Sequence, residues 1–84
     1  MLRVLFFASI RERLGRAGLT LDFVQDVARV QDLVQTLDRR ELPGCARVLL
    51  ADNTLVAVNR DVVTRDHALR DGDEVAFYPP VTGG

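Results

Sequence analysis

One apolar stripe with the period of an α-helix lies in the middle of the chain. Its members are Val30, Leu33, Val34 and Leu37. The spacing i, i+3, i+4, i+7 places them on one face of a helix of about three turns, and Pro43-Gly44 ends it. Elsewhere the apolar residues mostly follow the period of two that is typical of strands. Because 84 residues can form only one small core, the sequence predicts a single domain in which this helix packs on a sheet.

The segment before the helix reads as strand, short helix, strand. Residues 2–8 and 18–24 are rich in Val, Leu and Phe. Between them, Ser9 and Glu12 have the spacing of a capping box, and Gly15 is suited to the left-handed end of a short helix. The main helix has no Ser, Thr or Asn directly before Val30, so its start is less well defined than its end.

After Cys45 the pattern returns to strands. Residues 48–50, 55–58 and 74–78 are predicted strands, with turns at 52–53, 59–61 and 71–73 and a short apolar pair at 62–63. The fold class is therefore α+β, a mixed sheet packed on one main helix plus a short helix.

Composition and charge exclude several classes of protein. The chain is 48% hydrophobic and 27% charged with net charge −1, so it lacks the basic surplus of a nucleic-acid binder. Its apolar runs are too short to cross a membrane or to form a signal peptide. A single cysteine, Cys45, allows no internal disulfide and favours the reducing cytoplasm.

The sequence shows no catalytic or metal-binding cluster. His67 has no partner at ligand spacing and is expected in an exposed loop. Asp71, Asp73 and Glu74 are better explained as a turn than as a cation site, because further calcium ligands are missing. Cys45 is expected in a loop, where it is either a reactive thiol or, as we favour, an incidental small residue.

The last six residues are unlike the rest of a small domain. Pro79 and Pro80 cannot donate to a sheet, so they end the strand 74–78 and divide the chain into a domain, 1–78, and an extended tail, 79–84. At roughly 3.3–3.6 Å per residue, Val81 to Gly84 would carry the terminal carboxylate about 10–14 Å from the body. Residues without Cβ atoms can thread a narrow channel.

A carboxylate at the end of such a tail is a poor electrophile. It needs activation by another protein, for example as a mixed anhydride with AMP. The alternative is an inert end that happens to finish in glycine. All eleven basic residues are arginine, which codon usage explains most simply. A carrier of an activated acyl group would also benefit from having no lysine to capture it.

Three stretches resemble the small sulfur-carrier subunit of molybdopterin synthase, a family of ubiquitin-like β-grasp proteins of molybdenum cofactor biosynthesis. They are Val4–Ala8 with Arg11-Glu12, Val56–Asn59, and Asp71 to Gly84, which is the most specific. The resemblance implies a non-catalytic subunit with no bound cofactor or metal. An ATP-dependent, E1-like enzyme would adenylate Gly84, and a sulfur donor protein would convert the adenylate to a thiocarboxylate.

The resemblance also implies how the sulfur is used. The tail, with Val81, Thr82 and Gly83, would thread the active site of the large subunit and give sulfur to cyclic pyranopterin monophosphate. Catalytic residues would lie on the large subunit, in a heterotetramer of two small and two large chains. An apolar partner surface would comprise Phe7, Val62 and Tyr78 with Arg11 at its edge. For Phe7 the alternative is core packing, because Phe6 and Phe7 face opposite ways.

Other functions remain open. A carrier for thiazole or cysteine synthesis would share the fold and the Gly-Gly end. A ubiquitin-like modifier would join Gly84 to lysines of target proteins, and a plain interaction module would have an inert tail.

Overall fold

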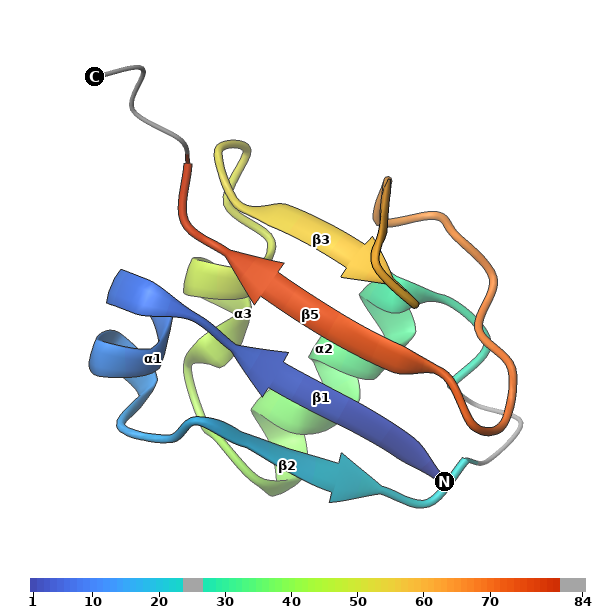
Figure 1. Cartoon of the computed structure of the whole chain (residues 1–84). Helices are drawn as coiled ribbons and strands as arrows, with labels where there is room; N and C mark the ends of the chain where they lie inside the picture. The colour runs from blue at the N-terminus through green and yellow to red at the C-terminus, as the bar shows by residue number, and fades with distance from the viewer. Residues whose placement is uncertain (24–26, 81–84) are drawn as a thin grey trace.

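The computed structural model describes residues 1–23 and 27–80 as one mixed sheet with helices on one face (Figure 1). The elements in chain order are β1 (Leu2–Phe6), α1 (Ala8–Leu14), β2 (Gly18–Leu21), α2 (Val30–Arg40), α3 (Cys45–Leu49), β3 (Leu55–Val58), β4 (Asp61–Val63) and β5 (Glu74–Tyr78). The predicted α+β class is confirmed. Within the described ranges, no helix is long and apolar enough to cross a membrane.

The first and last strands lie side by side in the middle of the sheet (Figure 1). The strand order is β2-β1-β5-β3-β4, with β5 parallel to β1 and antiparallel to β3. β5 is paired on both edges, and its central residues Val75, Ala76 and Phe77 are all buried. Val75 and Phe77 belong to the core cluster, whereas Ala76 points to the opposite face of the sheet, between the neighbouring strands. This position explains why the segment is a nearly continuous apolar run.

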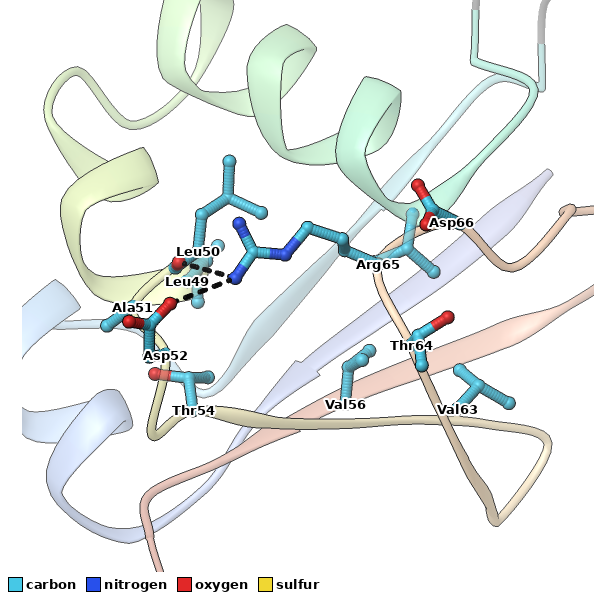
Figure 2. A pocket seen from close by; sticks show the side chains of 11 residues that line it. Leu49, Leu50, Ala51, Asp52, Thr54, Val56, Val63, Thr64, Arg65 and Asp66 are labelled. Carbon is cyan, nitrogen blue, oxygen red and sulfur yellow. Dashed lines mark hydrogen bonds and ion pairs between the residues drawn. The ribbon is translucent and has the colours of Figure 1, made fainter.

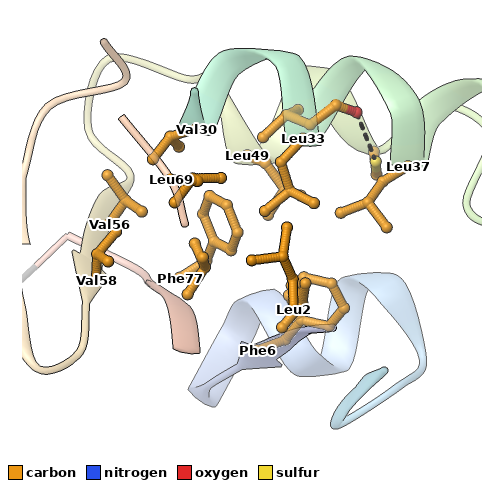
Figure 3. Packing of buried hydrophobic residues seen from close by; sticks show 14 of the residues in the cluster. Leu2, Phe6, Val30, Leu33, Leu37, Leu49, Val56, Val58, Leu69 and Phe77 are labelled. Carbon is orange, nitrogen blue, oxygen red and sulfur yellow. Dashed lines mark hydrogen bonds between the residues drawn. The ribbon is translucent and has the colours of Figure 1, made fainter. Parts of the chain in front are cut away.

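The helix α2 supplies one half of the core. Its predicted stripe is confirmed, because Val30, Leu33, Val34 and Leu37 are all buried. In Figure 3, Val30, Leu33 and Leu37 face strand residues such as Leu2, Phe6 and Phe77. At the start of α2, the Asp32 carboxylate accepts the backbone N–H of Arg29 at 3.0 Å, which satisfies one free donor without a capping hydroxyl.

The predicted strand at 48–50 is wrong, because residues 45–49 form the helix α3. Cys45, Val48 and Leu49 are buried at the helical spacing i, i+3, i+4. Asp38 on α2 accepts the N–H of Ala46 at 2.9 Å and so holds the start of α3. Cys45 is therefore the first residue of a helix and only 1% exposed, not part of a loop.

The predicted capping role of Ser9 is also wrong. The short helix α1 begins at Ala8, with Phe7 as the residue that precedes it, so Ser9 is an exposed residue of the first turn. The Phe7 N–H donates to the Phe77 carbonyl at 3.1 Å, which continues the parallel pairing one residue beyond β1 and fixes where the helix starts. The expected end at Gly15, with φ of 71°, is confirmed.

The β3–β4 hairpin is tied to the start of β5 by Asn59. Asn59 and Arg60 both have positive φ, 51° and 75°, as a two-residue hairpin turn requires. The Asn59 side chain donates to an Asp73 carboxylate oxygen at 2.8 Å and accepts the Glu74 N–H at 3.0 Å. On the other side of the sheet, β2 ends at Leu21; the expected last residue of that strand, Val24, lies outside the described residues.

Candidate functional site

An apolar groove opens where β5 ends. It has a volume of about 560 Å³ and is lined by Phe7, Ala8, Leu55, Val62, Tyr78, Pro79 and Pro80. Five separate segments meet there: the end of β1, the start of α1, the start of β3, the middle of β4 and the end of β5. Apart from the Tyr78 hydroxyl, every side chain in the lining is apolar.

Three of its large apolar side chains are exposed. Phe7 is 39% exposed, Leu55 37% and Val62 72%, whereas the neighbouring Phe6 is 1% exposed. The alternative of core packing therefore applies to Phe6 and not to Phe7. An exposed apolar cluster is typical of a surface that binds another protein.

The aromatic rings in the groove are held in a fixed arrangement. The rings of Phe7 and Tyr78 stack with centroids 4.8 Å apart and planes inclined by 4°. The backbone of Phe7 is fixed to β5 by its hydrogen bond to Phe77, and Ala8 turns the chain into α1 with φ of 52°. A left-handed alanine costs about 1–2 kcal/mol, so the rest of the fold must impose this bend.

The structure brings together three of the four predicted surface residues. Phe7, Val62 and Tyr78 share the groove. Arg11 is one helical turn after Phe7 on α1, is exposed, and does not belong to the lining. Sequence reasoning missed Ala8, Leu55, Pro79 and Pro80 as members of this surface; for Leu55, the missing information was its register opposite Tyr78.

The predicted tail starts at the rim of the groove. Pro80 lines the groove and is the last described residue at this end. The tail residues Val81, Thr82 and Gly83 and the carrier residue Gly84 lie outside the described residues. The described chain thus leads from the central strand of the sheet to the edge of an apolar surface.

A second hollow, of about 360 Å³, lies between α3 and β4 and is crossed by Arg65 (Figure 2). The Arg65 guanidinium donates to the Leu50 carbonyl at 3.1 Å and pairs with Asp52 at 3.6 Å. These bonds satisfy the carbonyl of Leu50 just after α3 and tie the two segments together. The Arg65 side chain therefore has a structural role.

The remaining titratable candidates lie in loops and turns. The side chain of His67 is exposed, and the backbone carbonyl of His67 accepts the Val30 N–H at 3.1 Å. Asp71 pairs with the N-terminal ammonium, and Asp73 accepts N–H groups from Asn59 and Arg70. Within residues 1–23 and 27–80, no cluster of His, Cys, Asp and Glu could hold a metal ion.

The Cys45 thiol is unsuited to nucleophilic chemistry. Burial, and to a lesser extent the nearby Asp38 carboxylate, raise the pKa of Cys45 from 9.0 to about 11. Its sulfur lies 4.0 Å from the Val34 carbonyl oxygen inside the core. At neutral pH it is a protonated core residue, in agreement with the interpretation as an incidental small residue.

Comparison with known proteins identifies the family. Residues 4–84 match the ThiS family. The chain belongs to the ThiS family. Over its full length it is 44% identical to the molybdopterin synthase sulfur carrier subunit of Escherichia coli and 41% identical to that of Haemophilus influenzae, in each case covering 100% of the relative.

Solved structures agree with this assignment to the ThiS family. SAMP1, a small archaeal modifier protein of Haloferax volcanii, superposes with a TM-score of 0.81 at 28% identity, with 99% of this chain and 98% of that chain covered. The predicted ubiquitin-like β-grasp fold is confirmed, and so is the resemblance to molybdopterin synthase sulfur carriers.

Proposed function

We propose that this ThiS-family chain is the sulfur carrier subunit of molybdopterin synthase, with its sulfur carried on the carboxyl group of Gly84. The observation that supports this most is the 44% identity, over the whole of both chains, to a protein of that name. The groove at the base of the tail adds a surface on which a partner could hold the domain while the tail enters its active site.

The carrier cycle needs two steps at Gly84. First, a carboxylate oxygen attacks the α-phosphorus of ATP on an E1-like activating enzyme; pyrophosphate leaves, and an acyl-adenylate forms. Second, sulfur at the oxidation level of sulfide, supplied by a donor protein, attacks the acyl carbon. The C–S bond forms, the bond to the AMP oxygen breaks, and AMP leaves with the electron pair. The product is a thiocarboxylate.

Sulfur transfer would follow on the large subunit. The thiocarboxylate sulfur forms a C–S bond to a carbon of cyclic pyranopterin monophosphate, and an oxygen substituent of that carbon leaves with the electron pair of its C–O bond. Water then attacks the acyl carbon of the resulting thioester, the C–S bond to Gly84 breaks, the sulfur stays on the pterin as a thiolate, and the carboxylate of Gly84 is released. The chain contributes position and reach, whereas catalytic groups belong to the large subunit. No cofactor of its own is required.

The groove supports docking to the large subunit in a heterotetramer. Aromatic side chains near the centre of an interface commonly contribute most of the binding free energy. Phe7 and Tyr78 are stacked and partly exposed before any partner binds, so little side-chain order has to be gained on association. We infer that Phe7, Val62 and Tyr78 contact the large subunit and that Arg11 lies at the edge.

Intact-mass spectrometry of the protein purified from its own host tests the carrier step. We expect a species heavier by the replacement of one oxygen with one sulfur, located at Gly84 by fragmentation. Deletion of Gly84 should leave the unfolding transition unchanged and abolish both adenylation and dithiolene formation with purified large subunit. Dithiolene formation by the truncated chain would refute the proposal.

A modifier function is the second candidate, favoured by the likeness to SAMP1. A modifier would form amide bonds between Gly84 and lysines of target proteins. Immunoblots of host extracts for conjugates of higher mass distinguish the two functions. The modifier function would be favoured if deletion of Gly84 removes the conjugates while the deletion strain still makes dithiolene at the full rate.

A further inference from the structure

The basic residues of this chain are all of one chemical type. All eleven are arginine, whose guanidinium stays protonated and is not nucleophilic, whereas a lysine amine could attack an activated acyl group. Within the 84-residue sequence, the α-amine of Met1 is the only aliphatic amine.

The structure places that amine far from the tail. The Met1 ammonium pairs with the Asp71 carboxylate, and the Met1 carbonyl accepts the Gly72 N–H at 3.0 Å. Both contacts are in the turn that precedes β5, whereas the tail leaves from the other end of that strand. The parallel pairing of β1 with β5 fixes this separation.

The distance between the Met1 amine and the start of the tail is larger than the length of the four residues that follow Pro80. From Glu74 to Tyr78, the four residue steps of β5 span about 13 Å at about 3.3 Å each. Met1 lies two residues beyond Arg3, the partner of Glu74, so it is about 20 Å from Tyr78 along the sheet. The four residues that follow Pro80 extend at most about 14 Å. The acyl carbon of Gly84 therefore cannot reach the Met1 amine while the domain is folded.

Near the start of the tail, the surface carries an arginine at a position where a lysine amine could attack the activated acyl group. Arg11 is on α1, and its N–H lies 3.4 Å from the carbonyl of Phe7, a residue of the groove. On the opposite side, exposed Asn53 precedes Leu55, which pairs with Tyr78. An amine at either place would be within reach of the four-residue arm, and such proximity raises the local concentration of the nucleophile to millimolar or above.

We propose that the fold keeps the reach of the tail free of amines, so that an activated Gly84 reacts with external acceptors and not with its own chain. This inference rests on the proposed function. The side reaction that this arrangement avoids is amide formation within the chain. A lysine nitrogen would attack the acyl carbon, a C–N bond would form, and the leaving group would depart with its electron pair. The carrier would be closed irreversibly into an amide ring.

The test uses a synthetic thioester, so that neither the activating enzyme nor the large subunit is involved. The parent chain, Arg11→Lys and Asn53→Lys are each prepared with a thioester on Gly84 by thiol cleavage of an intein fusion. They are incubated at mildly alkaline pH and followed by intact mass. We expect the parent to hydrolyse, and both variants to give at least tenfold more product that has lost the thiol without gaining water. Peptide mapping should join Gly84 to the introduced side chain.

Arg60→Lys is the matched control. It makes the same substitution in the exposed turn after β3, at the far end of the sheet, and should hydrolyse as the parent does. The proposal fails if neither near variant forms the amide, or if the parent closes onto Met1. Because the thioester is made chemically, this result is independent of whether the chain carries sulfur in its host.

Discussion

The rings of Phe7 and Tyr78 lie face to face, although one follows the first strand and the other ends the last. Their contact depends on the parallel pairing of β1 with β5, which brings residues 71 positions apart in sequence to the same edge of the sheet. The start of the predicted tail and the aromatic pair beside it are therefore positioned by one pair of strands.

Replacement of Phe7 by alanine should weaken binding to the large subunit by about 1–3 kcal/mol. The change in the free energy of unfolding should be about 1 kcal/mol or less, because the ring is partly exposed and loses mainly its stack on Tyr78. Titration calorimetry and urea unfolding measure the two quantities. Phe6→Ala is the matched control: it should cost about 3–5 kcal/mol of stability, because Phe6 is buried. A large loss of stability on Phe7→Ala would contradict its place at the surface.

Val62→Asp should reduce affinity for the large subunit at least tenfold and leave stability nearly unchanged. The side chain is 72% exposed in the free chain, so the charge costs little there, but burial at an interface would desolvate it. Asp61→Asn changes the charge at the adjacent position on the other face of β4 and should leave affinity unaltered. Because the first substitution adds a negative charge and the second removes one, effects of equal size and opposite sign would show that net charge, and not the groove, determines binding.

Asn59→Ala should lower the free energy of unfolding by about 1–3 kcal/mol, because it removes the two hydrogen bonds of the side chain to Asp73 and Glu74. Asn59→Gly removes the same bonds but tolerates the positive φ, so it should be less destabilising. Urea unfolding of both variants separates the backbone effect from the hydrogen bonds. Identical losses would mean that the turn conformation contributes nothing.

The Cys45 thiol should resist alkylation in the folded protein. With the pKa raised from 9.0 to about 11, the thiolate fraction at pH 8 is about a hundredfold lower than for an ordinary cysteine.

The raised pKa of Cys45 also makes the free energy of unfolding depend on pH. The stability that comes from keeping the thiol protonated in the folded chain is complete below pH 9 and is lost as pH rises through 11, because the thiol of the unfolded chain ionises first. Unfolding of the parent and Cys45→Ala at pH 8 and pH 11 should show the advantage of the parent shrinking at the higher pH. Rapid alkylation at pH 8 would contradict this.

The sequence predicts the elements whose signals are local. The stripe of α2, the glycine at the end of α1 and the turn before β5 are decided by neighbouring residues, and the structure confirms each. The sequence predicts a strand at 48–50, which overlaps α3, because a segment of five residues can fit the apolar period of a strand or of a helix. The hydrogen bond from the Ala46 N–H to Asp38, which favours the helix, is a tertiary contact and leaves no local sequence pattern. The start of α1 was misplaced for a similar reason, since pairing between Phe7 and Phe77 determines it.

The candidate site was predictable only in part. Phe7, Val62 and Tyr78 came from resemblance to a family, whereas Leu55 joins them through a register that no local pattern encodes. Arg11 lies outside the lining because it is a full turn into α1.

The central place of β5 also determines how the domain responds to force. Tension applied to the tail by a partner would act along the axis of a strand that is hydrogen-bonded on both edges, to β1 and to β3. Such a load shears all these bonds together, whereas an edge strand could be peeled away one bond at a time. The domain should therefore resist unfolding by a pull on its tail better than it would if β5 lay at an edge of the sheet.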